Sequence, residues 1–216
     1  MKISLQCCAM RSVCWSGDDE IMISFDLLTD IVLWPRIKGD FLRWQALLET
    51  SVTFSLASST IHTRMHEEHV LLFSLLMAED AALSDEEKDV LGAAAVFHDT
   101  RRQDDYYDVG HGRRAAQYYK QFCEQNGLVA DDRVDFLLSY HDQPDALGLA
   151  RLRENDFSGL KSLYDIFKDA DGVDRVRLGP NALDCDRLRT KKSLTLVPLA
   201  KHLNQGIISN GTGIKK

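Results

Sequence analysis

The chain has 216 residues, of which 44% are hydrophobic and 27% charged, and a formal net charge of −7. A chain of this length can bury most of its apolar surface in one domain, so neither a metal nor a disulfide is needed for folding. The balanced composition excludes disordered and fibrous proteins. The acidic charge disfavours nucleic acid and anionic lipid as main partners, because both repel a negative field.

The cysteines and the ends of the chain bear on its location. The five cysteines form no C-x-x-C pattern, and the odd number leaves at least one thiol unpaired in a monomer. Arg11 interrupts the early apolar run before a signal peptide could form, and no run reaches membrane-spanning length. We therefore expect a cytoplasmic protein without a membrane segment. Residues 1–24 are expected to be a flexible leader, 25–207 a single helical domain and 208–216 a frayed tail.

Apolar residues recur at helical spacing from the late twenties onward, while strand signals are sparse. The sequence therefore predicts an all-α fold. A first helix is expected over residues 25–34, ending at Pro35. Gly39 and Asp40 then precede an amphipathic helix over residues 41–54.

The middle of the chain predicts two core helices. Residues 66–80 form one apolar helical stretch. Ser84-Asp85-Glu86-Glu87 matches the capping box, in which a hydroxyl and a carboxylate satisfy the free N–H groups at a helix start. The helix that follows is apolar on almost all sides over residues 90–97, as expected of a central helix.

The second half of the chain predicts further helices, each with a start or stop signal. Gly127 is a suitable residue to close one helix, and Asp131 or Asp132 to begin the next. The expected helices cover residues 113–126, 132–142, 158–178 and 195–206.

Five of the seven histidines belong to two stretches of sequence. IHTRMHEEH places His62, His66 and His69 at offsets of four and three, which puts them along one face if the helix begins that early. AVFHDTRRQDDYYDVGHG places His98 and His111 on either side of a polar loop. An apolar helix that stops at ionisable residues is either an ordinary helix end or part of a site for a charged ligand.

A divalent metal needs neutral imidazole nitrogens and anionic oxygens that converge from rigid elements. His98 and Asp99 are adjacent, so they lie about 100° apart on a helix and can bind one ion only near its end. A third ligand is available from the histidine face, and a fourth from the acidic cluster DADGVD, which contains Asp169, Asp171 and Asp174. Two imidazoles and two carboxylates leave a divalent ion neutral, with positions open for water.

The ordered set His66, His98-Asp99 and Asp171 resembles the H…HD…D pattern of the HD-domain superfamily of metal-dependent phosphohydrolases. IHTRMHEEHV also resembles I-H-G-x-x-H-x-x-R-V of one subgroup, and VFHDTRR…GHGRRAA resembles that subgroup's segment after the paired ligands. The resemblance covers roughly residues 60–180. Thr63 stands where the subgroup has Gly, and His69 where it usually has Arg, which removes one fixed positive charge.

The resemblance implies a multi-helix bundle with a metal site at its centre. It implies His66, His98, Asp99 and Asp171 as the ligands, with Asp169 and Asp174 as alternatives to Asp171. Mixed nitrogen and oxygen ligation is compatible with manganese, iron, cobalt, nickel or magnesium. One bound ion is the favoured form.

The implied activity is hydrolysis of a small phosphate ester by a metal-activated water, with nucleotides among the candidate substrates. Asp99 is the candidate proton acceptor as well as a ligand, and a free neighbour such as Asp104, Asp105 or Asp142 is an alternative base. The basic and imidazole groups around the loop and the last acidic cluster suit an anionic substrate. The candidate substrate contacts are Arg101, Arg102, His111, Arg114, His141 and Arg175.

Other interpretations of the same residues stay open. His111 and His141 lie where some HD proteins carry ligands for a second metal. A non-catalytic metal-containing module that binds a phosphorylated ligand would show the same metal residues without turnover. A helical domain whose histidines only satisfy core hydrogen bonds would bind no metal.

Overall fold

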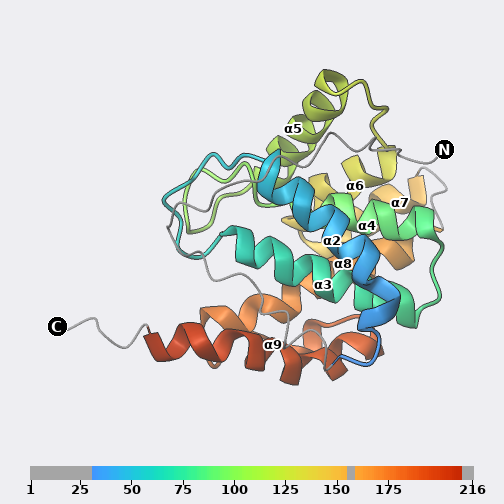
Figure 1. The fold of residues 1–216 in the computed structure, drawn as a ribbon. Helices are drawn as coiled ribbons and strands as arrows, with labels where there is room; N and C mark the ends of the chain where they lie inside the picture. Colours follow the sequence, from blue (N-terminus) through green and yellow to red (C-terminus); the bar gives the residue numbers. More distant parts are fainter. Residues whose placement is uncertain (1–30, 155–158, 211–216) are drawn as a thin grey trace.

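The computed structural model describes residues 31–154 and 159–210, the last five by their backbone alone. Every regular element within these ranges is helical, and the helices pack as a bundle (Figure 1). The expected all-α fold is confirmed. None of the described helices has the length and apolar character needed to cross a membrane. The expected leader, residues 1–24, lies outside the described ranges, as do residues 211–216 of the expected tail.

Helix α3 (Arg64–Asp80) is the centre of the bundle. It packs against α2 (Trp34–Thr50), α4 (Asp85–Phe97), α8 (Leu160–Asp174) and α9 (Lys191–Asn210) (Figure 1). Every residue of α3 from His66 to Glu79 is buried. Charged and imidazole groups on this helix therefore lie inside the protein, where each needs a partner.

The second half of the chain adds a layer to this centre. Helix α5 (His111–Gln125) packs on α6 (Asp132–His141), and α7 (Asp145–Glu154) contacts both α6 and α8. Figure 1 shows α5 projecting from the bundle at the top of the view. Two short 3₁₀ helices, η1 (Arg175–Leu178) and η2 (Cys185–Arg187), connect α8 to α9.

The helix boundary signals act as expected at three places. The Ser84 hydroxyl accepts the Glu87 N–H at 3.3 Å, and the Glu87 carboxylate accepts the Ser84 N–H at 2.8 Å, which completes the capping box. Gly127 follows α5 with a φ of 66°, a conformation that favours glycine. Asp131 is the N-cap residue before α6, and its carboxylate accepts the Arg133 N–H at 2.8 Å.

The first boundary differs from the expectation. Pro35 lies in the first turn of α2 instead of ending a helix. Gly39 and Asp40 lie within α2, and this helix ends at Thr50, before the expected limit at residue 54. Proline is well suited to the first turn of a helix because its missing N–H has no partner there in any case. Residues 25–30 of the first expected helix lie outside the described ranges.

Three later elements also differ. Helix α7 was not expected, since it is short and only Gly148 and Leu152 are buried within it. The helix expected over residues 158–178 is an α-helix only from Leu160 to Asp174 and continues as the 3₁₀ helix η1. Helix α9 includes Pro198 and begins at Lys191, earlier than expected.

Gly92 lets α4 approach α2. A Cβ on Gly92 would collide with the Trp44 ring, whereas a Cβ on Gly39 would meet nothing within 4 Å. We expect Gly92→Ala to lower the free energy of unfolding by about 1–3 kcal/mol through overpacking. Gly39→Ala is the matched control and is expected to raise it by about 0.5–1 kcal/mol, because alanine loses less backbone entropy in a helix. Urea unfolding curves of both variants measure the difference, and equal shifts would contradict the close packing of Gly92 on Trp44.

Candidate metal centre

Histidines and aspartates from four helices, α3, α5, α6 and α8, and from the turn after α4 meet in the interior of the bundle. His66 lies in the first turns of α3, and His98 and Asp99 follow the last residue of α4. Asp171 lies in α8. One donor atom from each of His66, His98 and Asp171 lies within 4.8 Å of the others. The fold thus brings His66, His98 and Asp171 together, although His66 and Asp171 are more than a hundred residues apart in the chain.

The ring nitrogens of His66 and His98 have defined roles. The Nδ1 of His98 lies 2.8 Å from the Ala95 carbonyl, and the Nδ1 of His66 lies 2.8 Å from the Asp174 carboxylate. Both oxygens can only accept, so each Nδ1 carries a proton, and Nε2 is the nitrogen that each ring presents to the other residues of the cluster. The two Nε2 atoms face each other at 3.2 Å. Two lone pairs at this distance repel unless a cation or a proton lies between them.

A second group of the same kind lies beside the first. The Nδ1 of His111 lies 2.6 Å from the Asp108 carbonyl, and the Nδ1 of His141 lies 2.8 Å from the Leu138 carbonyl. Their Nε2 atoms face each other at 3.0 Å. Asp99, His111 and His141 form a second set whose donor atoms lie within 4.8 Å of one another. A backbone carbonyl therefore fixes the tautomer of each ring, as in many metal sites.

Asp99 belongs to both groups. Its Oδ1 lies 3.0 Å from His111 Nε2 and 3.6 Å from His141 Nε2. Its Oδ2 lies 3.7 Å from His66 Nε2 and 3.9 Å from His98 Nε2. One carboxylate thus presents one oxygen to each pair of imidazoles, which is the arrangement of a carboxylate that bridges two cations.

The electrostatics of the cluster favour positive charge. Burial raises the pKa of Asp99, but the surrounding histidines reverse this effect and hold it well below the usual range. Burial and Arg177 lower the pKa of His66, yet Asp171 and Asp174 outweigh both and raise it to about 9. Burial lowers the pKa of His98 to about 3, so its ring is neutral. By contrast, burial raises the pKa of Glu67, a carboxylate without a described hydrogen-bond partner, well above the usual range.

The donor set fits divalent cations. Two ligands at about 2.1 Å from one ion and at right angles to each other lie about 3.0 Å apart, close to the 3.2 Å and 3.0 Å between the facing Nε2 atoms. Imidazole and carboxylate are the ligands that manganese, iron, cobalt and nickel accept. His66, His98, Asp99 and Asp171 would hold one ion, and Asp99, His111 and His141 a second.

Close packing of α5 on α6 positions the second group. A Cβ on Gly112 would collide with the Leu138 carbonyl and lie 2.9 Å from His141 Nδ1, so only glycine allows this approach. Asp142, directly after α6, accepts the N–H of Gly110 at 2.7 Å and thereby caps the start of α5. The two helix ends that carry His111 and His141 are thus fixed to each other.

The structure distinguishes the three aspartates of the DADGVD cluster. Asp171 Oδ1 lies 3.4 Å from His66 Nε2 and faces the first group. Asp174 accepts from the Nδ1 of His66 and from the Nδ1 of His69 at 2.7 Å. It therefore orients both rings and does not face the first group itself. Asp169 accepts the backbone N–H groups of Arg189 and Thr190. Asp169 is therefore part of a structural connection to the start of α9.

Replacing Asp169 tests this distinction. Asp169 is fully buried, and its carboxylate also pairs with the Arg189 guanidinium at 3.0 Å. We expect Asp169→Asn to lower the free energy of unfolding by about 1–3 kcal/mol, because the Asn amide cannot accept from all of these N–H groups, whereas Arg189 keeps its pair with Asp145. The folded protein is expected to keep its metal, whereas Asp171→Asn is expected to lose metal with little change in stability. Denaturant unfolding and elemental analysis separate the two effects, and the reverse pattern would exchange the two roles.

The arginines expected at the substrate differ in their positions. The Nη1 of Arg102 lies 3.6 Å from Asp99 Oδ1, so this guanidinium is at the centre. Arg101 stacks on the Tyr118 ring and bonds to Thr53. Arg114 pairs with Asp108. Arg175 is exposed, and the hydrogen bond described for it is with the Ala182 carbonyl. Among these four arginines, Arg102 alone has a described contact with the histidine and aspartate cluster.

Three residues of the centre had no clear signal in the sequence. His62 precedes α3, which begins at Arg64, so it does not share the helical face of His66 and His69. It nevertheless reaches Asp99, with its Nδ1 2.6 Å from Asp99 Oδ2. Asp174 appeared only as an alternative ligand, and Arg177 not at all. The Nη1 of Arg177 lies 3.5 Å from Asp174 Oδ2.

The contacts of Arg177 and His69 bear on the departure from the family pattern at position 69. His69 faces Asp174 in the interior and is buried. Arg177 supplies a positive charge to the same carboxylate from η1. His69, which stands where the resembling pattern usually has Arg, therefore holds Asp174 on the side of His66 that faces away from His98.

The helical bundle and the buried histidine and aspartate cluster are compatible with the HD type of fold. The cluster contains the motif residues in the expected order and can hold a metal ion. The chain matches no family model, no curated protein and no solved structure.

Proposed function

We propose that this chain is a metal-dependent phosphohydrolase that acts on a small phosphate ester with two divalent cations. The observation that carries the proposal is the position of Asp99 between two pairs of imidazoles whose Nε2 atoms face each other. Bound cations would supply an acidified water and would stabilise charge on the phosphoryl oxygens. Two dications exceed the charge of Asp99 and Asp171, so the centre attracts an anion.

A small cleft borders His62 at the edge of this centre. It has a volume of about 160 Å³, and its lining residues are Thr53, Phe54, Leu56, Ala57, Ser59, His62, Thr63 and Arg64. His62 contacts both the cleft and Asp99. Imidazole and guanidinium groups are suitable partners for phosphate oxygens. A phosphoryl group in this cleft would lie next to His62, which connects it to Asp99.

The residues of the chain supply the remaining parts of the reaction. Hydrolysis joins a water oxygen to phosphorus and breaks the bond to the ester oxygen, which must gain a proton. His62 donates its Nδ1 proton to Asp99, so its Nε2, which has no hydrogen bond with a described residue, is available to take the proton that the water loses. The imidazolium that forms can then pass this proton to the ester oxygen as the bond to phosphorus breaks. Arg102, beside Asp99 and His111, offsets charge that develops near the carboxylate.

A phosphate-release screen tests the proposal. Metal-free protein is reconstituted with manganese, iron, cobalt, nickel or magnesium and incubated with nucleotides and sugar phosphates. We expect metal-dependent release that His62→Gln and Asp99→Asn abolish and that His202→Gln, a change of an exposed histidine in α9, leaves intact. Tight metal and ligand binding without release would favour the non-catalytic module instead. A folded protein that binds no metal would contradict both.

A further inference from the structure

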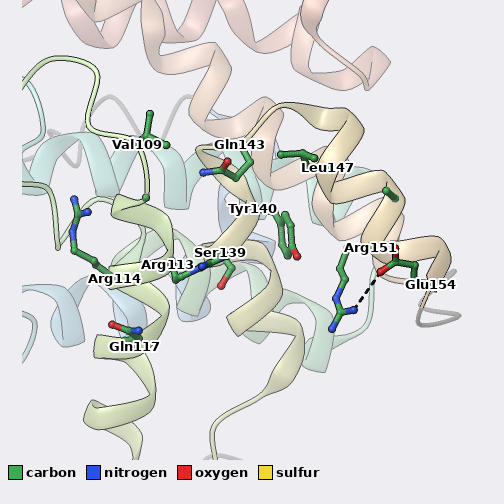
Figure 2. A pocket seen from close by; sticks show the side chains of 12 residues that line it. Val109, Arg113, Arg114, Gln117, Ser139, Tyr140, Gln143, Leu147, Arg151 and Glu154 are labelled. Atoms are coloured by element: carbon green, nitrogen blue, oxygen red, sulfur yellow. Dashed lines mark hydrogen bonds and ion pairs between the residues drawn. The ribbon is translucent and has the colours of Figure 1, made fainter.

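A second cleft lies between α5, α6 and α7, and no residue of the histidine and aspartate cluster lines it. Its volume is about 570 Å³, within the range of about 300–1,000 Å³ typical of small-molecule sites. Figure 2 shows Arg113 and Gln117 from α5 on one side, Tyr140 from α6 in the middle and Arg151 from α7 on the other side. The cleft is therefore large enough for a ligand of nucleotide size.

One wall of the cleft presents polar groups without protein partners. Arg113 and Gln117 are four residues apart on α5 and so lie on one face. Neither side chain has a hydrogen bond or ion pair with a described residue, and the same holds for the hydroxyl of Ser139 on the facing helix α6. A guanidinium, an amide and a hydroxyl are thus available together to hold an anionic group.

The neighbouring Arg114 differs from Arg113 because its guanidinium pairs with a carboxylate. Arg114 also lines the cleft, but it makes two bonds to the Asp108 carboxylate, at 2.6 and 2.5 Å. On the far side, Arg151 pairs with Glu154 at 3.3 Å. Among the described residues, no acidic side chain pairs with Arg113, although the net charge of the chain is −7. The cleft has a local excess of positive charge in an acidic protein, which favours an anionic ligand.

The other wall offers flat and apolar surface. Leu147 of α7 is 53% exposed and borders the cleft. The Tyr140 ring lies between Leu147 and the polar wall (Figure 2), and it packs against Phe136 with a centroid distance of 4.8 Å, which restricts its orientation. An aromatic ring on a rigid support beside an exposed leucine side chain suits a planar ligand group.

We propose that this cleft binds a small organic anion with one phosphate-like group and a planar ring. The phosphate-like group lies against Arg113, Gln117 and Ser139, and the ring lies between Tyr140 and Leu147. The cleft also borders Gly110, whose N–H is bonded to Asp142 at the junction that carries His111 and His141. A ligand here contacts the backbone next to the metal centre without touching its ligands.

Isothermal titration of the full-length protein with phenylphosphonate and 1-naphthylphosphonate tests the site. These probes carry a dianion and a ring, and their C–P bond resists hydrolysis. We expect saturable binding that Arg113→Gln weakens by at least about tenfold, equal to about 1.4 kcal/mol. Arg187→Gln is the matched control, because Arg187 is an exposed arginine outside the cleft that pairs with Asp184. It is expected to leave the affinity unchanged.

Further variants locate the bound probe. Asp99→Asn is expected to keep probe binding, because the cleft is separate from the metal centre, and Leu147→Ser is expected to weaken the naphthyl probe more than inorganic phosphate. Loss of binding in Asp99→Asn would place the probe at the metal centre and overturn the proposal. Absence of saturable binding by either phosphonate, or equal affinity in Arg113→Gln and wild type, would also overturn it.

Discussion

Asp99→Asn is expected to remove metal from both halves of the centre and to lower phosphate release by more than about a hundredfold. This loss is larger than the loss of about 10–100-fold that is typical of changing a residue that only hydrogen-bonds to a metal ligand. Asn keeps the shape of the side chain but loses the charge that both imidazole pairs face. Only one of its two terminal atoms can accept. The Asn side chain therefore cannot bridge two cations, even if its one oxygen still binds one of them.

Asp171→Asn is the comparison for this variant. Asp171 contacts His66 in the first group and has no described contact with His111 or His141. We expect Asp171→Asn to lose one ion per chain and Asp99→Asn to lose both, while circular dichroism shows both variants folded. Elemental analysis after gel filtration measures the stoichiometry. Identical metal content in the two variants would argue against a shared carboxylate.

Asp174→Asn is expected to lower both the metal affinity and the free energy of unfolding. This buried carboxylate accepts from His66, His69 and the Asn204 amide, and Arg177 lies 3.5 Å away. In Asp174→Asn one imidazole N–H would face an amide N–H₂ and lose its acceptor. We expect metal affinity to fall about 10–100-fold because His66 is no longer held in the tautomer that presents Nε2. The free energy of unfolding of the metal-free protein is expected to fall by about 3–5 kcal/mol.

His69→Asn separates these two consequences for Asp174. It removes one donor to the Asp174 carboxylate but leaves the bond between Asp174 and His66 in place. We expect a loss of stability with metal affinity close to that of wild type. Metal titrations and urea unfolding on the three proteins measure the two quantities independently. Wild-type metal affinity in Asp174→Asn would show that the carboxylate does not orient His66.

The sequence predicted the parts of this structure that depend on neighbouring residues. The capping box at Ser84 and the positive φ of Gly127 require only local geometry, and both were found. The helical spacing of apolar residues predicted the all-α fold for the same reason. Pro35 was misassigned because proline both ends helices and begins them, and the sequence around it does not decide between the two.

The details of the centre depend on residues that are far apart in the chain. His66 and Asp174 are separated by 108 residues, and their contact forms only when α8 packs on α3. His62 lies outside the helix, so helical periodicity does not predict that it reaches Asp99. The pairing of His111 with His141 follows from the close approach of α5 and α6 at Gly112, which a single sequence does not reveal.

Anomalous X-ray scattering from crystals grown with manganese measures whether cations bind on both sides of Asp99. We expect two anomalous peaks per chain, one among His66, His98 and Asp171 and one beside His111 and His141, each within ligand distance of Asp99. A single peak at the first position would instead support the one-metal form that the sequence favoured. No peak next to Asp99 at saturating manganese would exclude metal binding by this carboxylate.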